Sequence, residues 1–220
     1  MEENSKFPVR DLEQQFSLLS GAGDLIFQYQ VTRGINFYGR MLVRAGSRNG
    51  EHELYGETRL PLLNRATSHR LLVLKGGKEI REEAKSGENL HLMTSFFPDE
   101  GPGRLTVVPA RGPTREYPLE TRAFPVSVFL SPFLAYCCGE MLLHYMGTPC
   151  WVVSPARTAA SGTEAGALDR IQLRTLTPLE GSDKMDAATL EGAIIDSDPK
   201  NGIPMEMRGA FQGYRVKFWR

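Results

Sequence analysis

The feature that most constrains this chain is a short alternation of apolar and polar residues that recurs along most of its length. Alternate residues from Leu25 to Val31 are apolar, and the same period returns in six later segments. A period of two places successive side chains on opposite faces of a β-strand. The predicted apolar stripes are Leu25, Phe27, Tyr29 and Val31; Ile35, Phe37, Met41 and Val43; Leu90, Leu92 and Phe96; Leu105 and Val107; Ile171, Leu173 and Thr175; Ile203, Met205 and Met207; and Tyr214, Val216 and Phe218.

Glycine, proline and asparagine separate these segments in combinations that favour tight turns. Short strands that recur with one polar face are typical of an antiparallel sheet that packs on one side and meets water on the other. The fold class predicted is therefore mainly β (α+β). The turn signals are Arg33-Gly34, Ser47-Arg48-Asn49-Gly50, Gly76-Gly77, Gly101-Pro102-Gly103, Arg111-Gly112-Pro113 and Asn201-Gly202.

Three segments depart from the alternation. Residues 8–20 carry apolar side chains at helical spacing and are followed by Gly21, which predicts a helix. Residues 125–138 are too long and too apolar for an edge strand, so a buried helical segment, kinked or started at Pro132, is expected within 125–146. Residues 154–167 are small and polar, which indicates a loop. The predicted organisation is an N-terminal helical segment, 1–23, and a single β domain, 24–220.

Composition excludes some function classes and restricts others. Lysine plus arginine equals aspartate plus glutamate at 26 each, whereas nucleic-acid-binding proteins usually carry a basic excess. Interrupting residues such as Pro132 and Glu140 make 124–146 a poor candidate for a membrane span. The opening residues lack the basic start and apolar run of a secretory signal, so none is expected there.

The three cysteines, Cys137, Cys138 and Cys150, do not form the even set of a disulfide framework. A bridge between the adjacent pair would be strained, while a bridge from Cys150 to either is geometrically possible. The main expectation is that they are buried small hydrophobes, and their redox state stays open.

No catalytic or metal-binding constellation is recognisable. None of the four histidines, His52, His69, His91 and His144, forms a metal-ligand pair at short spacing. His91 is expected on the wet face of its strand, and Cys138 with His144 is better explained as buried core than as a nucleophile pair. Residues 196–202 lack the calcium-loop ligands and predict a hairpin turn. The charged residues 78–88 predict a solvated hairpin. No enzymatic activity and no cofactor are therefore predicted.

Three stretches carry a resemblance to a known family. They are LIFQYQVTRGINFYGRMLV at 25–43, GTPCWVV at 147–153, and AIIDSDPKNGIPMEMRGAFQGYRVKF at 193–218. In this order they resemble the hairpins of the LolA-like superfamily, which comprises periplasmic lipoprotein-carrier proteins and related bacterial domains of unknown function. The resemblance covers about residues 24–219.

The resemblance implies a strongly curved antiparallel sheet, or incomplete barrel, wrapped over one or two helices, and a periplasmic setting. It also implies a non-enzymatic binding protein that holds a lipid, acyl chain or other hydrophobic ligand against an apolar concave face. The alternative is a structural or assembly subunit that uses a sheet edge, such as the C-terminal strand with Trp219, to bind a protein partner. Membrane association without a spanning segment stays open.

The residues expected to line or cover an apolar pocket lie in the apolar middle of the chain. Ligand sites are typically concave and mostly apolar, and these side chains could equally fill the sheet from within. They are Phe124, Val128, Phe129, Phe133, Tyr136, Met141 and Tyr145.

Overall fold

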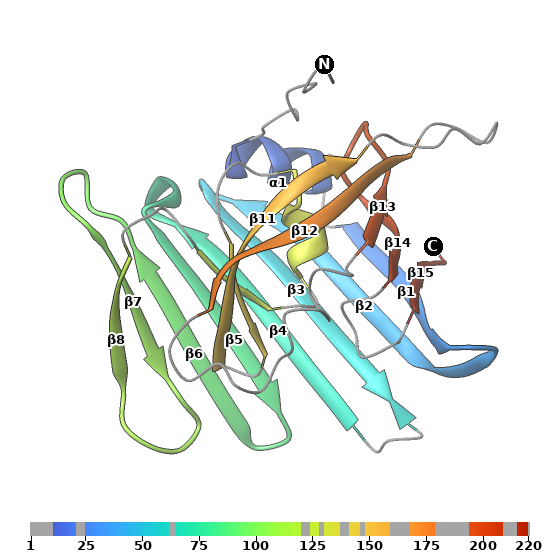
Figure 1. Cartoon of the computed structure of the whole chain (residues 1–220), viewed down its shortest axis with the longest axis horizontal. Coiled ribbons are helices and arrows are strands. Elements are labelled where there is room, and N and C mark those ends of the chain that lie inside the picture. The colour runs from blue at the N-terminus through green and yellow to red at the C-terminus, as the bar shows by residue number, and fades with distance from the viewer. Residues whose placement is uncertain are drawn as a thin grey trace.

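The computed structural model confirms a mainly β, antiparallel fold (Figure 1). The described strands form one sheet of fifteen, and the described residues contain one α-helix, α1 (Leu12–Ser20). The structure describes residues 11–20, 25–61, 65–119, 124–127, 130–136, 141–145, 148–158, 168–178, 194–208 and 215–219.

In the first half of the chain, strands coincide with the alternating segments at 25–31, 35–43, 90–96 and 105–107, whereas the strands at 51–60, 65–74 and 79–86 are not among the predicted stripes. Their bounds are β1 (Leu25–Arg33), β2 (Asn36–Arg48), β3 (Glu51–Leu60), β4 (Arg65–Leu74), β5 (Glu79–Ser86), β6 (Asn89–Phe96), β7 (Gly103–Val108), β8 (Arg115–Leu119), β9 (Phe124–Ser127), β10 (Met141–Tyr145), β11 (Thr148–Thr158), β12 (Asp169–Pro178), β13 (Ile194–Ser197), β14 (Pro204–Arg208) and β15 (Arg215–Phe218).

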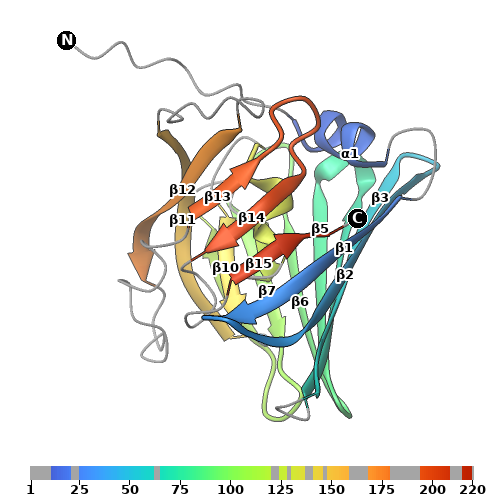
Figure 2. The same ribbon diagram turned by 90° about the vertical axis from the view of Figure 1, so that its right-hand side faces the viewer.

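The first and last strands meet in the middle of the sheet. The spatial order runs from β8 down to β1, then from β15 down to β9. β15 lies between β1 and β14, and Val31 is paired with Val216 (Figure 2). All neighbours are antiparallel except β9 and β10. The C-terminal strand is therefore not the exposed edge that the sequence offered for partner binding; the edges are β8 and β9.

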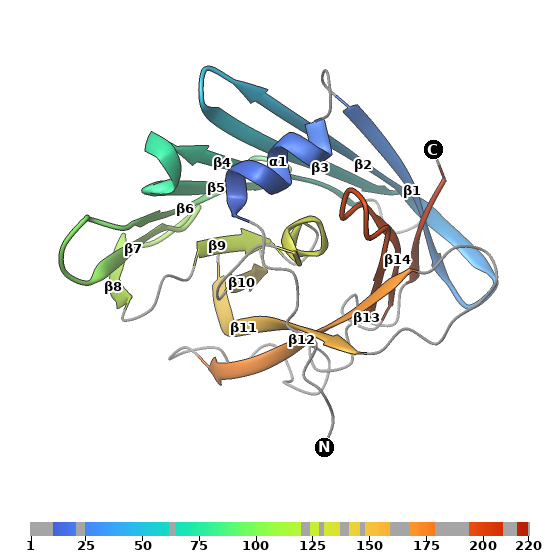
Figure 3. The ribbon, with the colours of Figure 1, turned by 90° about the horizontal axis from the view of Figure 1, so that it is seen from above.

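The sheet bends until its two ends approach, but it does not close. Seen from above, β1–β8 form one side and β9–β12 the other (Figure 3). The edge strand β9 packs against β5 and β6, yet no hydrogen-bonded ladder joins them among the described residues. The inner side of this bend carries the buried apolar side chains of both halves.

Helix α1 closes one end of the inner face against β2 and β3. The Asp11 carboxylate accepts a hydrogen bond from the Gln14 backbone N–H at 2.6 Å, which satisfies a donor left free in the first turn. Phe16 and Leu19, one turn apart, are fully buried. The helix predicted over residues 8–20 is thus confirmed at Leu12–Ser20.

One predicted stripe is broken by a β-bulge in β2. Met41 and Val43 point inward as expected, but Phe37 is 49% exposed and Ile35 fully exposed. Val31 is paired with Gly39 and Thr32 with Phe37, so one extra residue lies between them in β2. Such a bulge inverts the alternation beyond it, which moves Phe37 to the outer face.

The faces of β6 are reversed relative to the sequence prediction. Leu90 and Phe96 share a face with Leu92, but this is the outer face, where Leu90 is 51% exposed. Met93 and Ser95 point inward instead and are buried. His91 belongs to their face, and its Nδ1 accepts the Ala110 N–H at 3.3 Å. The prediction that His91 lies on the solvent-facing side of its strand was therefore wrong. The pairing of β6 with its neighbouring strands decides which face points inward, and the apolar content of a face does not.

The apolar segment 125–146 is not one helix. Its described parts are β9, a single 3-10 turn η3 (Ser131–Leu134) and β10. Two prolines explain the difference: Pro125 lies in an edge strand, where a missing N–H is tolerated, and Pro132 lies at the start of η3, where it starts a turn without sustaining a helix.

Substitutions of two inner glycines should separate backbone from side-chain crowding. A Cβ at Gly39 would lie 1.9 Å from the Arg59 carbonyl oxygen, whereas at Gly56 it would lie 2.8 Å from the flexible Leu130 Cδ2. We expect Gly39→Ala to lower the free energy of unfolding by about 3 kcal/mol and Gly56→Ala by about 1 kcal/mol or less. Urea denaturation measures the free energy of unfolding of both variants. Equal losses of stability would contradict the close approach of the Arg59 backbone to Gly39.

Candidate functional site

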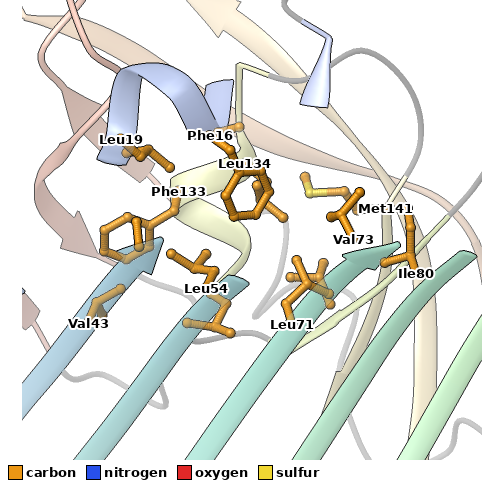
Figure 4. Packing of buried hydrophobic residues seen from close by; sticks show 14 of the residues in the cluster. Phe16, Leu19, Val43, Leu54, Leu71, Val73, Ile80, Phe133, Leu134 and Met141 are labelled. Carbon is orange, nitrogen blue, oxygen red and sulfur yellow. The ribbon is translucent and has the colours of Figure 1, made fainter. Parts of the chain in front are cut away.

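A short segment fills the inner face of the sheet where a ligand would be expected. This inner turn, residues 130–136, carries Leu130, Phe133, Leu134 and Tyr136, which are all fully buried. Phe133 and Leu134 lie above Val43, Leu54 and Leu71 of the sheet (Figure 4). The Phe133 ring also meets Phe27 and Tyr29, with centroids 6.0 and 5.7 Å apart.

The inner turn fits a recess that the sheet leaves free of side chains. Gly56 of β3 is flanked by Val43 on β2 and His69 on β4. A Cβ at Gly56 would meet the Leu130 side chain at 2.8 Å. Glycine within a strand commonly marks the close approach of another group, and here it lets Leu130 reach the sheet.

Few polar contacts hold the inner turn. Gln15 of α1 is fully buried, and its Nε2 donates to the Phe133 carbonyl at 3.0 Å and to the Asn201 carbonyl at 3.4 Å. The Tyr136 hydroxyl donates to the Asp169 carboxylate at 2.7 Å. The inner turn is therefore tied to α1 on one side and to β12 on the other, and the Leu130 N–H also donates to the Ser127 hydroxyl at 3.3 Å.

Some buried hydroxyls facing the interior lack a hydrogen-bond partner. In the part of the chain that the structure describes, these are Tyr29, Ser95 and Ser197, each with its oxygen shielded from solvent. Burial raises the pKa of the Tyr29 hydroxyl well above its usual value. An unpaired buried donor costs about 1–3 kcal/mol, so a water molecule or a polar ligand group bound there would be stabilised.

A titratable pair lies beside the recess. His69 of β4 and Glu82 of β5 are 1% and 0% exposed, and His69 Nδ1 is 3.6 Å from Glu82 Oε1. The prediction of a wholly solvated hairpin at 78–88 was therefore wrong for Glu82, which points into the sheet interior.

In contrast to the apolar inner face, the outer face of β2, β3 and β4 carries charged side chains. Arg70 of β4 donates from Nε to Glu53 at 2.7 Å, and Arg44 lies over the Tyr55 ring at 5.1 Å. These four residues, with Ala45 and Gly46, line a shallow depression of about 470 Å³. It is an open, charged hollow on the opposite side of the sheet from the apolar interior.

A second charged cluster covers β12–β15. Asp196 is hydrogen-bonded by Arg170 and Arg208, each at 2.7 Å, while Glu206 pairs with Arg208 and Arg215. Burial raises the pKa of Asp196, but the two arginine hydrogen bonds outweigh it and hold the pKa below its ordinary value. The predicted turn that follows is confirmed: the Asp198 N–H donates to the Ile203 carbonyl at 3.0 Å, and Gly202 has a φ of 73°.

The predicted pocket residues divide into three groups. Phe133, Tyr136 and Met141 are buried together in the interior. Phe124 and Tyr145 lie in β9 and β10, and their side chains lie outside the described part of the chain. Val128 and Phe129 lie outside the described residues altogether, as do Cys137 and Cys138.

The sequence patterns did not identify four residues of the interior: Gln15, Gly56, His69 and Glu82. A signal existed for the last two, because His69 is in phase with Leu71 and Val73, and Glu82 with Ile80 and Ala84. Their shared period with buried neighbours places them on the inner face. Gln15 is at helical spacing from Leu12 and Leu19 and so shares their face, but its partners Phe133 and Asn201 are distant along the chain and no local pattern indicates them.

No family model, curated protein or solved structure matches this chain. Function is therefore inferred from geometry alone. Within the described ranges, the one α-helix is too short to cross a bilayer, and acidic, histidine and cysteine side chains do not gather into a metal site.

Two tyrosines of the interior should respond oppositely to loss of the hydroxyl. Tyr29→Phe removes an unpaired donor, so we expect the free energy of unfolding to stay equal or to rise by up to about 1 kcal/mol. Tyr136→Phe removes the bond to Asp169 and should lower it by about 2 kcal/mol. Chemical denaturation of both variants tests this; a large loss for Tyr29→Phe would mean that its hydroxyl is paired.

Acid should selectively weaken the Asp196 cluster. A carboxyl whose pKa is lowered on folding stabilises the protein above its unfolded value, near 3.8, and this contribution is lost as pH falls through the folded value. Because the arginines are partly exposed, we expect Asp196→Asn to cost about 1 kcal/mol at neutral pH. The difference in stability between Asp196→Asn and the wild type, measured by thermal unfolding, should become smaller below pH 4. The control variant Glu88→Gln, which changes an exposed residue, should have the stability of the wild type throughout.

Proposed function

We propose that this protein is a non-enzymatic binding protein that holds a hydrophobic ligand, a lipid or acyl chain, against the inner face of its sheet. In this proposal the sheet is an incomplete barrel wrapped over α1 and η3, and the inner turn occupies the ligand site in the unliganded protein. The observation that carries the proposal is the seating of Leu130 over Gly56 and of Phe133 against Phe27 and Tyr29.

The contacts of the inner turn are of the kind an acyl chain could replace. They are mainly apolar and non-directional, so their strength follows the buried area. The backbone contributes little: η3 is one 3-10 turn without a side-chain cap. Among polar groups, the unpaired Tyr29 hydroxyl supports a ligand that carries a hydrogen-bond acceptor, such as a carboxyl or ester oxygen.

A second candidate is the structural or assembly subunit, whose interior is permanently filled by its own side chains. Complete burial of Leu130, Phe133, Leu134 and Tyr136 favours it. The free edge strand β8 (Arg115–Leu119) would then be available to a partner. Pro118 and two exposed charges in that strand weaken the case, because such residues discourage strand addition.

Native mass spectrometry of protein purified from its own host distinguishes the two candidates first. A discrete adduct of lipid mass, identified after solvent extraction, supports the binding protein. A bare chain mass, or a stable complex with another protein, supports the subunit.

Truncating the Phe133 side chain of the inner turn should tighten ligand binding if the turn and the ligand compete for the inner face of the sheet. Phe133→Ala removes about 3–5 kcal/mol of buried contact, which shifts the competition towards the ligand. In lipid-free protein titrated with a dansyl-labelled undecanoic acid, we expect at least about tenfold tighter binding, equivalent to about 1.4 kcal/mol.

Leu105→Ala is the matched control, because Leu105 is equally buried but belongs to β7 rather than to the inner turn. It should lose comparable stability without any gain in affinity. If Phe133→Ala also binds no probe, the self-filled subunit is the better description.

A further inference from the structure

One end of the sheet carries exposed apolar side chains beside unpaired basic ones. The turns joining β1 to β2, β5 to β6 and β7 to β8 all lie at the same end, because consecutive strands are antiparallel. They lie at the end opposite α1, along the lower margin of Figure 1. We define the hairpin rim as these three turns and their flanking residues, 33–37, 85–90 and 108–115.

Large apolar side chains project from the rim into solvent. Ile35 is fully exposed, Leu90 is 51% exposed, Phe37 49% and Val108 39%. Single exposed apolar residues are ordinary, but a fully exposed isoleucine at a turn has no folding role. The bulge in β2 is what moves Phe37 outward beside it, so local backbone geometry adds to the exposure.

Basic residues lie on the same hairpins as these apolar ones. Lys85 is the cross-strand neighbour of Leu90. Arg115 is the cross-strand neighbour of the buried Val107 and lies at the same end of the sheet as Val108, on the opposite face. Arg111 lies in the turn between β7 and β8. All three are exposed, and no ion pair engages them among the described residues. The one acidic residue in the β5–β6 turn is Glu88.

Elsewhere on the outer face several arginines are matched with carboxylates, as in Arg70 with Glu53 and Glu83, and Arg81 with Glu79. Arg44, the cross-strand neighbour of the exposed Ile26, instead lies over the Tyr55 ring. The rim differs in gathering, at one end of the sheet, several protruding apolar groups and several basic residues without an ion pair in the described part of the chain. That combination is typical of surfaces that enter the interface of an anionic membrane.

We propose that the hairpin rim docks on an anionic phospholipid surface. Ile35, Phe37, Leu90 and Val108 enter the headgroup region while Lys85, Arg111 and Arg115 contact lipid phosphates. A protein partner fits less well, because the apolar groups stand on separate hairpins, about 10 Å apart for each pair of strands crossed, with charges between them. This proposal does not rest on the ligand proposed above.

Vesicle sedimentation of the full chain tests the docking. We expect binding to phosphatidylcholine vesicles that contain phosphatidylglycerol, little binding to pure phosphatidylcholine, and release by salt. Ile35→Asp should weaken partitioning by about tenfold. Combined Lys85→Gln, Arg111→Gln and Arg115→Gln should weaken it by about a hundredfold at low salt.

Ile26→Asp provides a matched control. Ile26 is 57% exposed in β1, near the end that faces α1. The same substitution there should leave vesicle binding unchanged, and circular dichroism checks that both variants fold. Absence of binding to anionic vesicles, or an equal loss in Ile26→Asp, would overturn the proposal. So would a change of oligomeric state in Ile35→Asp without vesicle binding, which would assign the rim to a protein interface.

The two proposals fail separately. If lipid-free protein sediments with anionic vesicles but does not bind the acyl probe, the docking proposal is supported and the ligand proposal is contradicted. If the protein binds the probe but does not sediment with vesicles, the ligand proposal is supported and the docking proposal is contradicted.

Discussion

The burial of one face of the sheet against the inner turn is the interaction on which the rest of the structure depends. An open antiparallel sheet has two faces, and an apolar one must be covered. Here the sheet bends, and Phe133 and Leu134 from the turn meet side chains of β2, β3 and β4. Without this contact, Val43, Leu54 and Leu71 would lose the apolar side chains that cover them.

This dependence links stability to function. In the function that we propose, the apolar inner face would be costly to expose to water when no ligand is bound. A segment of the protein's own chain covers this face, with hydrogen bonds from Gln15 to its backbone and from its Tyr136 to Asp169. In the same proposal, a ligand would replace the apolar contacts of this segment. The outer face carries most of the described ion pairs, while the inner face is mainly apolar, so the two faces serve different contacts.

Sequence reasoning predicted the mainly antiparallel character, the helix at Leu12–Ser20, the inward stripes of β1 and β7 and several turns. It failed where pairing rather than periodicity decides the face. The bulge between Gly39 and Phe37 moves Phe37 to the outer face. In β6 the inner face carries Met93 and Ser95, while Leu90, Leu92 and Phe96 lie on the outer face. Sequence reasoning also predicted a buried helical segment within 125–146, kinked or started at Pro132; the structure has a buried 3-10 turn that starts there, but strands β9 and β10 on either side of it.

The amino-acid sequence by itself determined that the chain consists mainly of short strands and tight turns, because a period of two and glycine-rich turns are local properties of the chain. It also placed Phe133, Tyr136 and Met141 in the long apolar segment expected to be buried or to line a pocket. Only the tertiary structure decided that β1 pairs with β15, that Gly56 receives Leu130, and that Glu82 is buried beside His69. Those outcomes depend on contacts between residues far apart along the chain, which local periodicity does not encode.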